Sequence, residues 1–334
     1  MWNMGQNSAF SARVEQEGTV EVVRLADAAR QMEVRIAPSI GNLAYAFTVN
    51  GKNALWFPFS GLEELRAKPA LCGIPFLAPW ANRLDGDSYW VNGKRYQLNS
   101  ALGNLRRDGH QKPIHGLLLF SSAWALTATG ADAHSAYATS RLEFWRHPEL
   151  MAQFPFAHNL TVTYRLENGS LAVETRIDNH SREALPVAIG YHPYFQLHDA
   201  PRDQWTVHLA ARERLLLDEF LIPTGAREPL PFADPHPLRT RPLDDVFGGL
   251  MRDETGVARF WVTGQREKIE VAYGPQYGVA VVYAPEGQGF LCFEPMAAIT
   301  NAFNLAQAGV YRELPSVAPE GQWSESFWVT PSGF

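Results

Sequence analysis

Apolar and polar residues alternate with a period of two along much of this chain, a pattern typical of β-strands with one buried face. Residues 161–167 and 171–177 both alternate in this way and flank Asn168-Gly169. An Asn-Gly pair between two alternating runs is a strong signal for a two-residue hairpin turn. We therefore expect antiparallel hairpins to be the basic unit of the fold.

Other segments show strand patterns of the same kind. They are residues 19–25, 32–37, 43–49 before Asn50-Gly51, 88–91 and 94–98 around Asn92-Gly93, 118–128, 205–209, 278–283 and 326–329. Helical patterns are scarce, and we expect only residues 62–68, stopped by Pro69, to form about two turns. The proline-rich residues 223–242 are expected to form a long excursion. Because strands do not alternate with long helices, we predict an all-β fold, a large antiparallel β-sandwich.

Composition narrows the classes of partner. The 334 residues include 46% hydrophobic and 19% charged residues, as in a globular protein, and we expect a single domain over residues 1–334. A formal net charge of -6 argues against nucleic acid, which requires a basic face. No apolar run approaches the ~18 residues of a membrane span. Residues 1–18 lack a signal-peptide pattern, so we expect a cytoplasmic protein.

Cysteine and metal chemistry find little support in the sequence. Cys72 and Cys292 both lie in apolar, strand-like stretches, and we expect buried free thiols. The chain has no phosphate-binding glycine loop, no nucleophile elbow and no metal-binding His-Glu-x-x-His helix. We therefore expect no metal site.

Two short segments stand out as candidates for acid/base chemistry. They are His192-Pro193-Tyr194-Phe195 and Phe293-Glu294-Pro295. Unperturbed Glu and His titrate at roughly 4.3 and 6.5, so one group can take a proton while the other gives one. The proline after His192 holds that residue extended. Glu294 follows an apolar run, so we expect it at a half-buried strand end, with a raised pKa.

Three further positions carry candidate binding groups, each with a structural alternative. Arg83 follows an apolar run. It is either a buried group that offers five hydrogen-bond donors to a ligand or a surface charge that ends the run. His115 precedes Gly116, which permits close approach of a ligand or of another backbone. The adjacent acids Asp244 and Asp245 suit sugar hydroxyls, or form a solvated turn.

Taken in order along the chain, these segments resemble the aldose 1-epimerase (galactose mutarotase) family. The resemblance covers roughly residues 20–332, and the paired His-Pro-Tyr-Phe and Glu-Pro elements are its most specific part. It rests on Asn82-Arg83 with the following Asn-Gly hairpin, His115-Gly116, His192-Pro193-Tyr194-Phe195, the Asp244 turn and Glu294-Pro295. It implies a large antiparallel β-sandwich that binds a sugar on a concave sheet face.

The resemblance also implies roles for these residues in an isomerase that interconverts α and β anomers. Glu294 resembles the general base that deprotonates the anomeric hydroxyl, and His192 resembles the general acid that protonates the ring oxygen. Arg83 and His115 look like the groups that orient the sugar. Asp244 is similar to the acid that holds hydroxyls, with Asp245 as the alternative. The resemblance implies no metal or organic cofactor and a small sugar as the partner. We expect a monomer or homodimer, and the sequence does not decide between them.

Two departures leave alternatives open. The family often shows two glycines after the histidine, whereas here Gly116 is followed by three leucines. The basic segment 104–112 holds Arg106, Arg107 and Lys112, which could meet a phosphate, as in the related hexose-6-phosphate 1-epimerases. A sugar-binding sandwich without turnover is another alternative. A glycoside-cleaving enzyme would require two nearby carboxylates.

Overall fold

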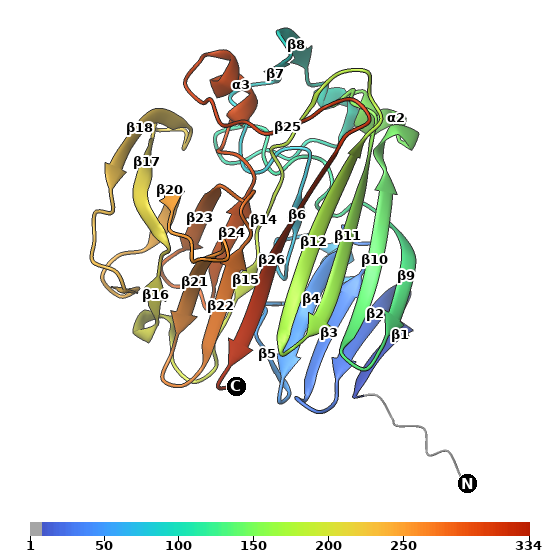
Figure 1. Cartoon of the computed structure of the whole chain (residues 1–334), viewed down its shortest axis with the longest axis vertical. Coiled ribbons are helices and arrows are strands. Elements are labelled where there is room, and N and C mark those ends of the chain that lie inside the picture. The colour runs from blue at the N-terminus through green and yellow to red at the C-terminus, as the bar shows by residue number, and fades with distance from the viewer. Residues whose placement is uncertain (1–8) are drawn as a thin grey trace.

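The computed structural model describes residues 9–334, most of them in antiparallel sheets (Figure 1). The first sheet has five strands in sequence order and forms the blue layer in Figure 1. Its strands are β1 (Phe10–Glu17), β2 (Val20–Asp27), β3 (Met32–Ala37), β4 (Leu43–Val49) and β5 (Lys52–Asn53).

A nine-stranded sheet runs the width of the molecule, in the order β19-β16-β21-β22-β26-β12-β11-β10-β9. The C-terminal strand β26 lies at its centre and joins its two halves, pairing with β22 on one side and β12 on the other. The strands are β9 (Ala125–Ala131), β10 (Ser135–Glu143), β11 (His158–Glu167), β12 (Ser170–Asn179), β16 (Thr206–His208), β19 (His236–Pro237), β21 (Ala258–Thr263), β22 (Lys268–Tyr273) and β26 (Gln322–Ser332).

A third large sheet has eight strands. Its order is β18-β17-β20-β23-β24-β14-β6, with β15 also paired to β24. The strands are β6 (Phe76–Leu77), β14 (Gly190–Tyr191), β15 (Tyr194–Phe195), β17 (Ala211–Leu217), β18 (Pro223–Pro229), β20 (Leu243–Leu250), β23 (Val279–Ala284) and β24 (Leu291–Met296).

Small elements complete the fold. Two pairs of short strands are β7 (Ser88–Val91) with β8 (Lys94–Gln97), and β13 (Leu185–Pro186) with β25 (Ser316–Val317). The α-helices are α1 (Leu62–Ala67), α2 (Pro148–Met151) and α3 (Ala302–Gln307). Figure 1 shows α2 and α3 near the upper ends of the strands, away from the packed sheet faces.

The sheets pack face to face as a sandwich. Strands β1 and β2 of the five-stranded sheet lie against β9, β10 and β11 of the nine-stranded sheet. At the other end, Phe293 of the eight-stranded sheet packs against Phe260 of the nine-stranded sheet, with ring centroids 6.0 Å apart. Isolated bridges at Ala44–Ile74 and Leu55–Phe195 join the five- and eight-stranded sheets into one layer. The predicted all-β sandwich is confirmed.

The Asn-Gly hairpins form where the sequence predicts them. Glu167 pairs with Ser170 across the Asn168-Gly169 turn, whose two residues have φ values of 50° and 79°. Positive φ at both central residues is the requirement of a type I′ turn, and Asn-Gly meets it at low cost. The β7–β8 hairpin is confirmed in the same way, as are helix α1 and the two buried free cysteines.

Three local predictions need correction. The strand expected over residues 118–128 begins only at Ala125, because Leu117 N–H bonds Ala78 O and residues 118–121 form a turn. Residues 223–242 contain β18 and β19, since β18 folds back on β17 as a hairpin. Helices α2 and α3 are too short to show a periodic pattern and were not expected.

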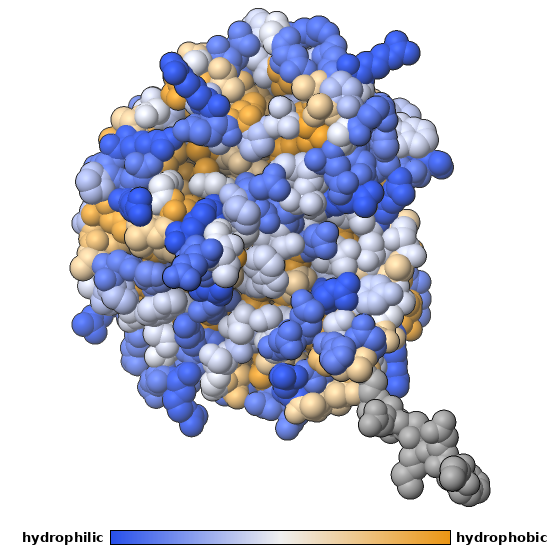
Figure 2. Space-filling model, viewed as in Figure 1, coloured by the Kyte–Doolittle hydropathy of each residue, from blue (hydrophilic) through white to orange (hydrophobic). Residues whose placement is uncertain are grey.

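The surface in the view of Figure 2 is largely polar, with apolar patches in the upper half. Among residues 9–334, no helix is long and apolar enough to cross a membrane. The expectation that the chain carries no signal peptide falls partly on residues 1–8, which lie outside the described part of the chain.

Candidate functional site

A cavity of about 250 Å³ lies on the exposed face of the eight-stranded sheet, over β20, β23 and β24. Every residue predicted from the sequence as catalytic or sugar-binding contributes to its wall. The lining comprises Leu71, Asn82, Arg83, Ile114, His115, His192, Tyr194, Asp244, Val281, Tyr283 and Glu294. The fold thus brings together residues that are up to 223 positions apart in the sequence (Leu71 to Glu294).

Strand alternation aims Glu294 at the cavity. Its neighbour Phe293 is fully buried in the sandwich core, so Glu294 projects from the opposite face of β24. Glu294 lies beside Val281 on β23. The expected strand end is wrong, because β24 continues through Pro295 to Met296 and Glu294 lies within it. A position within a paired strand holds a carboxylate more rigidly than a strand end would.

His192 lies at the break between β14 and β15. Tyr191 points into the core against Phe327, at 4.9 Å between ring centroids, so the next residue turns toward the cavity. The His192 N–H donates to Pro75 O at 3.1 Å. The imidazole stacks on Tyr194 with the rings 4.7 Å apart and only 4° from parallel. These contacts fix both the backbone and the ring plane of His192.

The candidate acid and base lie next to one another. His192 Nε2 is 3.4 Å from Glu294 Oε1, and both side chains are almost fully buried. Burial raises the pKa of Glu294 well above its usual range, and the negative charge of Asp244 adds to this while Arg83 opposes it. Burial also lowers the pKa of His192 to about 3, with a further contribution from Arg83. Desolvation therefore favours the neutral pair, which shares one ionisable proton.

Arg83 and His115 reach the cavity from two segments that run side by side. Arg83 and Ile114 form a bridge, and His115 N–H donates to Asn82 O at 2.8 Å. His115 has φ 62°, and Gly116 has φ 65°. The His115 ring lies 5.4 Å from that of His192, nearly perpendicular to it. Among the described residues, its Nδ1 has no hydrogen-bond partner, and neither has Glu294 Oε2.

The left-handed backbone at residues 115 and 116 explains the glycine. A Cβ at Gly116 would lie 2.1 Å from Ala78 O, so only glycine allows these two segments to approach so closely. His115, which has a side chain, takes the same conformation at a cost of roughly 1–2 kcal/mol. Non-glycine residues in this region are often found at functional sites.

The two adjacent acids on β20 point in opposite directions. Asp244 lies opposite Tyr283 and lines the cavity, on the same sheet face as Glu294. Asp244 as a whole is exposed to solvent, but partial burial of its carboxyl group raises the pKa of that group. Asp245 is buried away from the cavity, where it accepts hydrogen bonds from Arg214 at 2.8 Å and from Arg241 at 2.9 Å. Of the two alternatives, Asp244 is therefore the one that lines the cavity.

The basic segment 104–112 contributes no free cation to the cavity wall. Arg107 pairs with Asp87 at 2.9 Å, and Lys112 pairs with Asp85. Arg106 is exposed and lies over the Phe120 ring, with 5.6 Å from Cζ to the ring centroid. None of these three cations belongs to the cavity lining.

Sequence reasoning missed several cavity residues. Leu71, Val281 and Tyr283 line it, but their contribution depends on which strands pair. The alternation of residues 278–283 predicts a strand with two faces, but it does not show which face lies on the same side of the sheet as Asp244. Tyr194 belongs to the predicted His-Pro-Tyr-Phe segment, but its stacking on His192 depends on the fold. Asp108, which binds Arg83 Nε at 2.6 Å, gave no signal beyond the Asp-Gly turn that it begins.

A larger hollow of about 460 Å³ is lined in part by Leu215, Gly248 and Tyr311. It contains no histidine. Its Arg227 and Glu313 lie 3.6 Å apart and are paired with one another. The candidate acid and base, His192 and Glu294, both line the smaller cavity. Among residues 9–334, no group of three or more His, Cys, Asp or Glu is arranged to hold a metal ion.

Comparison with known proteins bears on the family and the fold of the chain. The family model for aldose 1-epimerase matches residues 22–330. The uncharacterized protein YihR of Escherichia coli (strain K12) is 25% identical over 236 residues, 68% of this chain and 70% of the relative.

Solved structures share the fold. A galactose mutarotase-like protein from Clostridium acetobutylicum has a TM-score of 0.86 at 19% identity, covering 98% of this chain and 100% of the other. Galactose 1-epimerase from Lactobacillus acidophilus NCFM has a TM-score of 0.71 at 14% identity, covering 97% and 100%. With the family model matching nearly the whole chain, this protein belongs to the aldose 1-epimerase family.

Proposed function

We propose that the protein is an aldose 1-epimerase that interconverts the α and β anomers of an aldose. The observation that supports this most is the buried pair of Glu294 and His192, 3.4 Å apart in a cavity of about 250 Å³. A purely binding protein has no need for a proton donor and a proton acceptor side by side. The remaining polar groups, Arg83, His115 and Asp244, surround this pair as hydroxyl and ring-oxygen partners.

In the proposed mechanism, Glu294 takes the proton of the anomeric hydroxyl while His192 protonates the ring oxygen. The C1–O5 bond breaks, and the sugar opens to an aldehyde. Rotation about C1–C2 presents the other carbonyl face, and the same groups act in reverse on closure. Each positioned proton transfer contributes about 10²–10⁴-fold.

The pair begins and ends each turnover with the same number of protons. The neutral pair, Glu294 protonated and His192 uncharged, differs from the charge-separated pair only in the position of one proton. Desolvation makes the His192 imidazolium a strong acid and the Glu294 carboxylate a strong base. Ring opening converts the charge-separated pair into the neutral pair that desolvation favours. On closure, Glu294 returns a proton to the carbonyl oxygen and His192 takes one back from the O5 hydroxyl, which restores the charge-separated pair; no step requires a metal or an organic cofactor.

Charge pairing favours an aldose without a phosphate group. A phosphate seeks unpaired Arg and Lys donors. Arg107 and Lys112 are already held by Asp87 and Asp85. Arg83, the one cation in the cavity wall among residues 9–334, is bound to Asp108.

Polarimetry tests the proposal. Freshly dissolved α-D-glucose and α-D-galactose should approach their equilibrium rotation faster with the protein, and α-D-glucose 6-phosphate should respond less. Calorimetric titration with the same sugars is the parallel measurement. Binding without acceleration would contradict the proposal and favour a carbohydrate-binding sandwich. Acceleration confined to the phosphate would instead favour a hexose-6-phosphate 1-epimerase.

A further inference from the structure

The side chain and backbone of Arg83 are both held in place. Its Nε donates to Asp108 Oδ2 at 2.6 Å, and one terminal nitrogen donates to Asn82 Oδ1 at 2.9 Å. Its carbonyl accepts the N–H of Asn301 at 2.9 Å. A guanidinium has five N–H donors, so three remain for a ligand once the two contacts within the described residues are counted.

Asp108 has a second task, because its other oxygen closes a turn. Oδ1 accepts the N–H groups of His110 and Lys112, both at 2.9 Å. Its N–H bonds Lys112 O at 3.0 Å. The carboxylate thus connects the guanidinium of Arg83 to the backbone of the 108–112 loop. The hydrogen bonds of the turn hold that carboxylate in one orientation.

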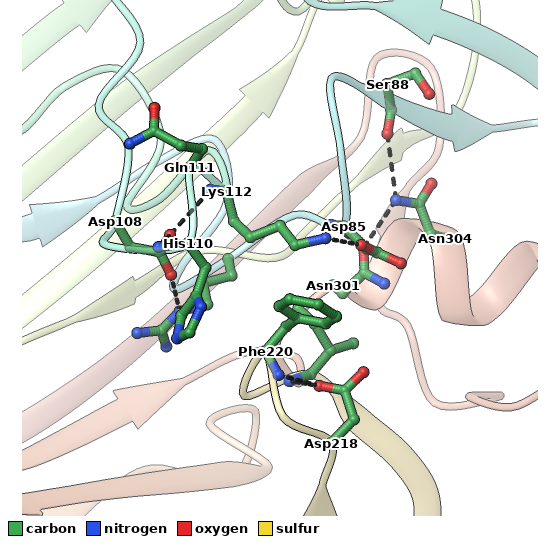
Figure 3. A network of polar contacts seen from close by, with 12 residues as sticks. Asp85, Ser88, Asp108, His110, Gln111, Lys112, Asp218, Phe220, Asn301 and Asn304 are labelled. Atoms are coloured by element: carbon green, nitrogen blue, oxygen red, sulfur yellow. Dashed lines mark hydrogen bonds and ion pairs between the residues drawn. The ribbon is translucent and has the colours of Figure 1, made fainter.

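The same loop also contacts other segments of the chain, as Figure 3 shows. Lys112 reaches toward Asp85, and Phe220 lies below it, with 4.6 Å from Nζ to the ring centroid. Phe220 also meets His110 edge to face at 5.7 Å. Asp85 N–H in turn donates to Asn301 Oδ1 at 3.0 Å. Arg83 is thereby fixed within a network that spans four separate segments of the chain.

We propose that Asp108 is a positioning residue for the epimerase reaction, holding the Arg83 guanidinium in the orientation that receives the sugar. This inference rests on the proposed function. Without the Asp108 carboxylate, the Arg83 side chain loses its shortest contact and turns about its own bonds. Its positive charge then also acts on Glu294 and His192 without a counter-charge beside it.

The second effect has a definite sign. Arg83 already lowers the pKa values of both Glu294 and His192. Removing the negative charge next to Arg83 strengthens that effect, so the pKa values of the pair fall further. The alkaline limb of the activity profile should therefore move to lower pH. A residue with only a structural role would reduce stability or total activity without moving the profile.

Asp108→Asn is the test, with Asp87→Asn as the matched control. Asparagine keeps an oxygen that accepts the two backbone N–H groups, so the loop should still fold. Asp87 also pairs with an arginine of this segment, Arg107, but does not touch Arg83. We expect Asp108→Asn to raise KM about tenfold or more, the scale of a lost hydrogen bond to a charged group, and to shift the alkaline limb downward. Asp87→Asn should do neither.

Asp108→Glu separates the two effects. It restores the charge but not the short turn geometry, so the pH profile should return toward that of the wild type while KM stays high. Equal KM values and superimposable pH profiles for Asp108→Asn and Asp87→Asn would overturn the inference. If the wild type itself failed to accelerate mutarotation, the proposed function would fail instead, which keeps the two failures distinguishable.

Discussion

Gly116→Ala should disturb the site through the backbone alone. The added Cβ would lie 2.1 Å from Ala78 O, well inside the 3.0 Å that such contacts respect. The two segments must therefore part by roughly 1 Å, a distance at which dispersion contacts and hydrogen bonds between them are weakened. His115, the preceding residue, moves with them. We expect a loss of about 1–2 kcal/mol for the left-handed backbone and about 1–3 kcal/mol for the forced separation.

Gly103→Ala isolates the first contribution. Gly103 has φ 70°, close to that of Gly116, but no atom lies within 4 Å of the position that an added Cβ would take. Urea titration of both variants gives their free energies of unfolding, and polarimetry gives turnover. Gly103→Ala should show only the backbone cost with normal turnover. Gly116→Ala should lose more stability and about 10²-fold in rate, as expected for misplacement by about 1 Å. Equal stability losses and unchanged turnover would refute this reasoning.

Three further predictions concern the cavity residues. His192→Gln should lower turnover by about 10²–10⁴-fold at an almost unchanged melting temperature; a collapsed melting temperature would indicate a structural role. The rate should follow a bell-shaped pH profile. Activity is lost on the acid side as a second proton joins the pair near the His192 pKa of about 3, and on the alkaline side as pH rises through the raised pKa of Glu294. A rate that rises through pH 6.5 would contradict this prediction. Asp244→Asn should raise KM with little effect on stability. Asp245→Asn should leave KM unchanged but cost about 1–3 kcal/mol of unfolding free energy, because it weakens the contacts of residue 245 to Arg214 and Arg241. If Asp245 were the sugar-binding acid, the two variants would exchange these results.

Local sequence patterns predicted much of the fold because a hairpin is determined by residues that are close together in the sequence. Asn168-Gly169 fixes a turn through its own φ values, and the alternating strands beside it follow. Which sheets these hairpins join is a long-range matter. The pairing of β26 with both β12 and β22 connects residues 54 (Tyr273 to Phe327) to 158 (Leu171 to Val329) positions apart, and no periodicity reveals it.

The candidate site was predicted as a set of residue types and not as a geometry. The order of the His-Pro and Glu-Pro segments singled out His192 and Glu294, but their separation depends on the break between β14 and β15. Period two allowed either Asp244 or Asp245 to face a ligand, and the pairing of β20 with β23 decides between them. Asp108 could not be predicted, because its partner Arg83 is 25 residues away across a loop with no repeating pattern.

The central claim is that Glu294 exchanges a proton with the sugar, and the mutarotation rate of Glu294→Gln tests it most directly. Glutamine keeps the shape of the side chain but cannot take the proton. Polarimetry of α-D-galactose should show a rate lower by about 10²–10⁴-fold, while calorimetry still detects sugar binding and the melting temperature does not fall. An unchanged rate in this variant would contradict the assignment of Glu294 as the base, and with it the proposed mechanism.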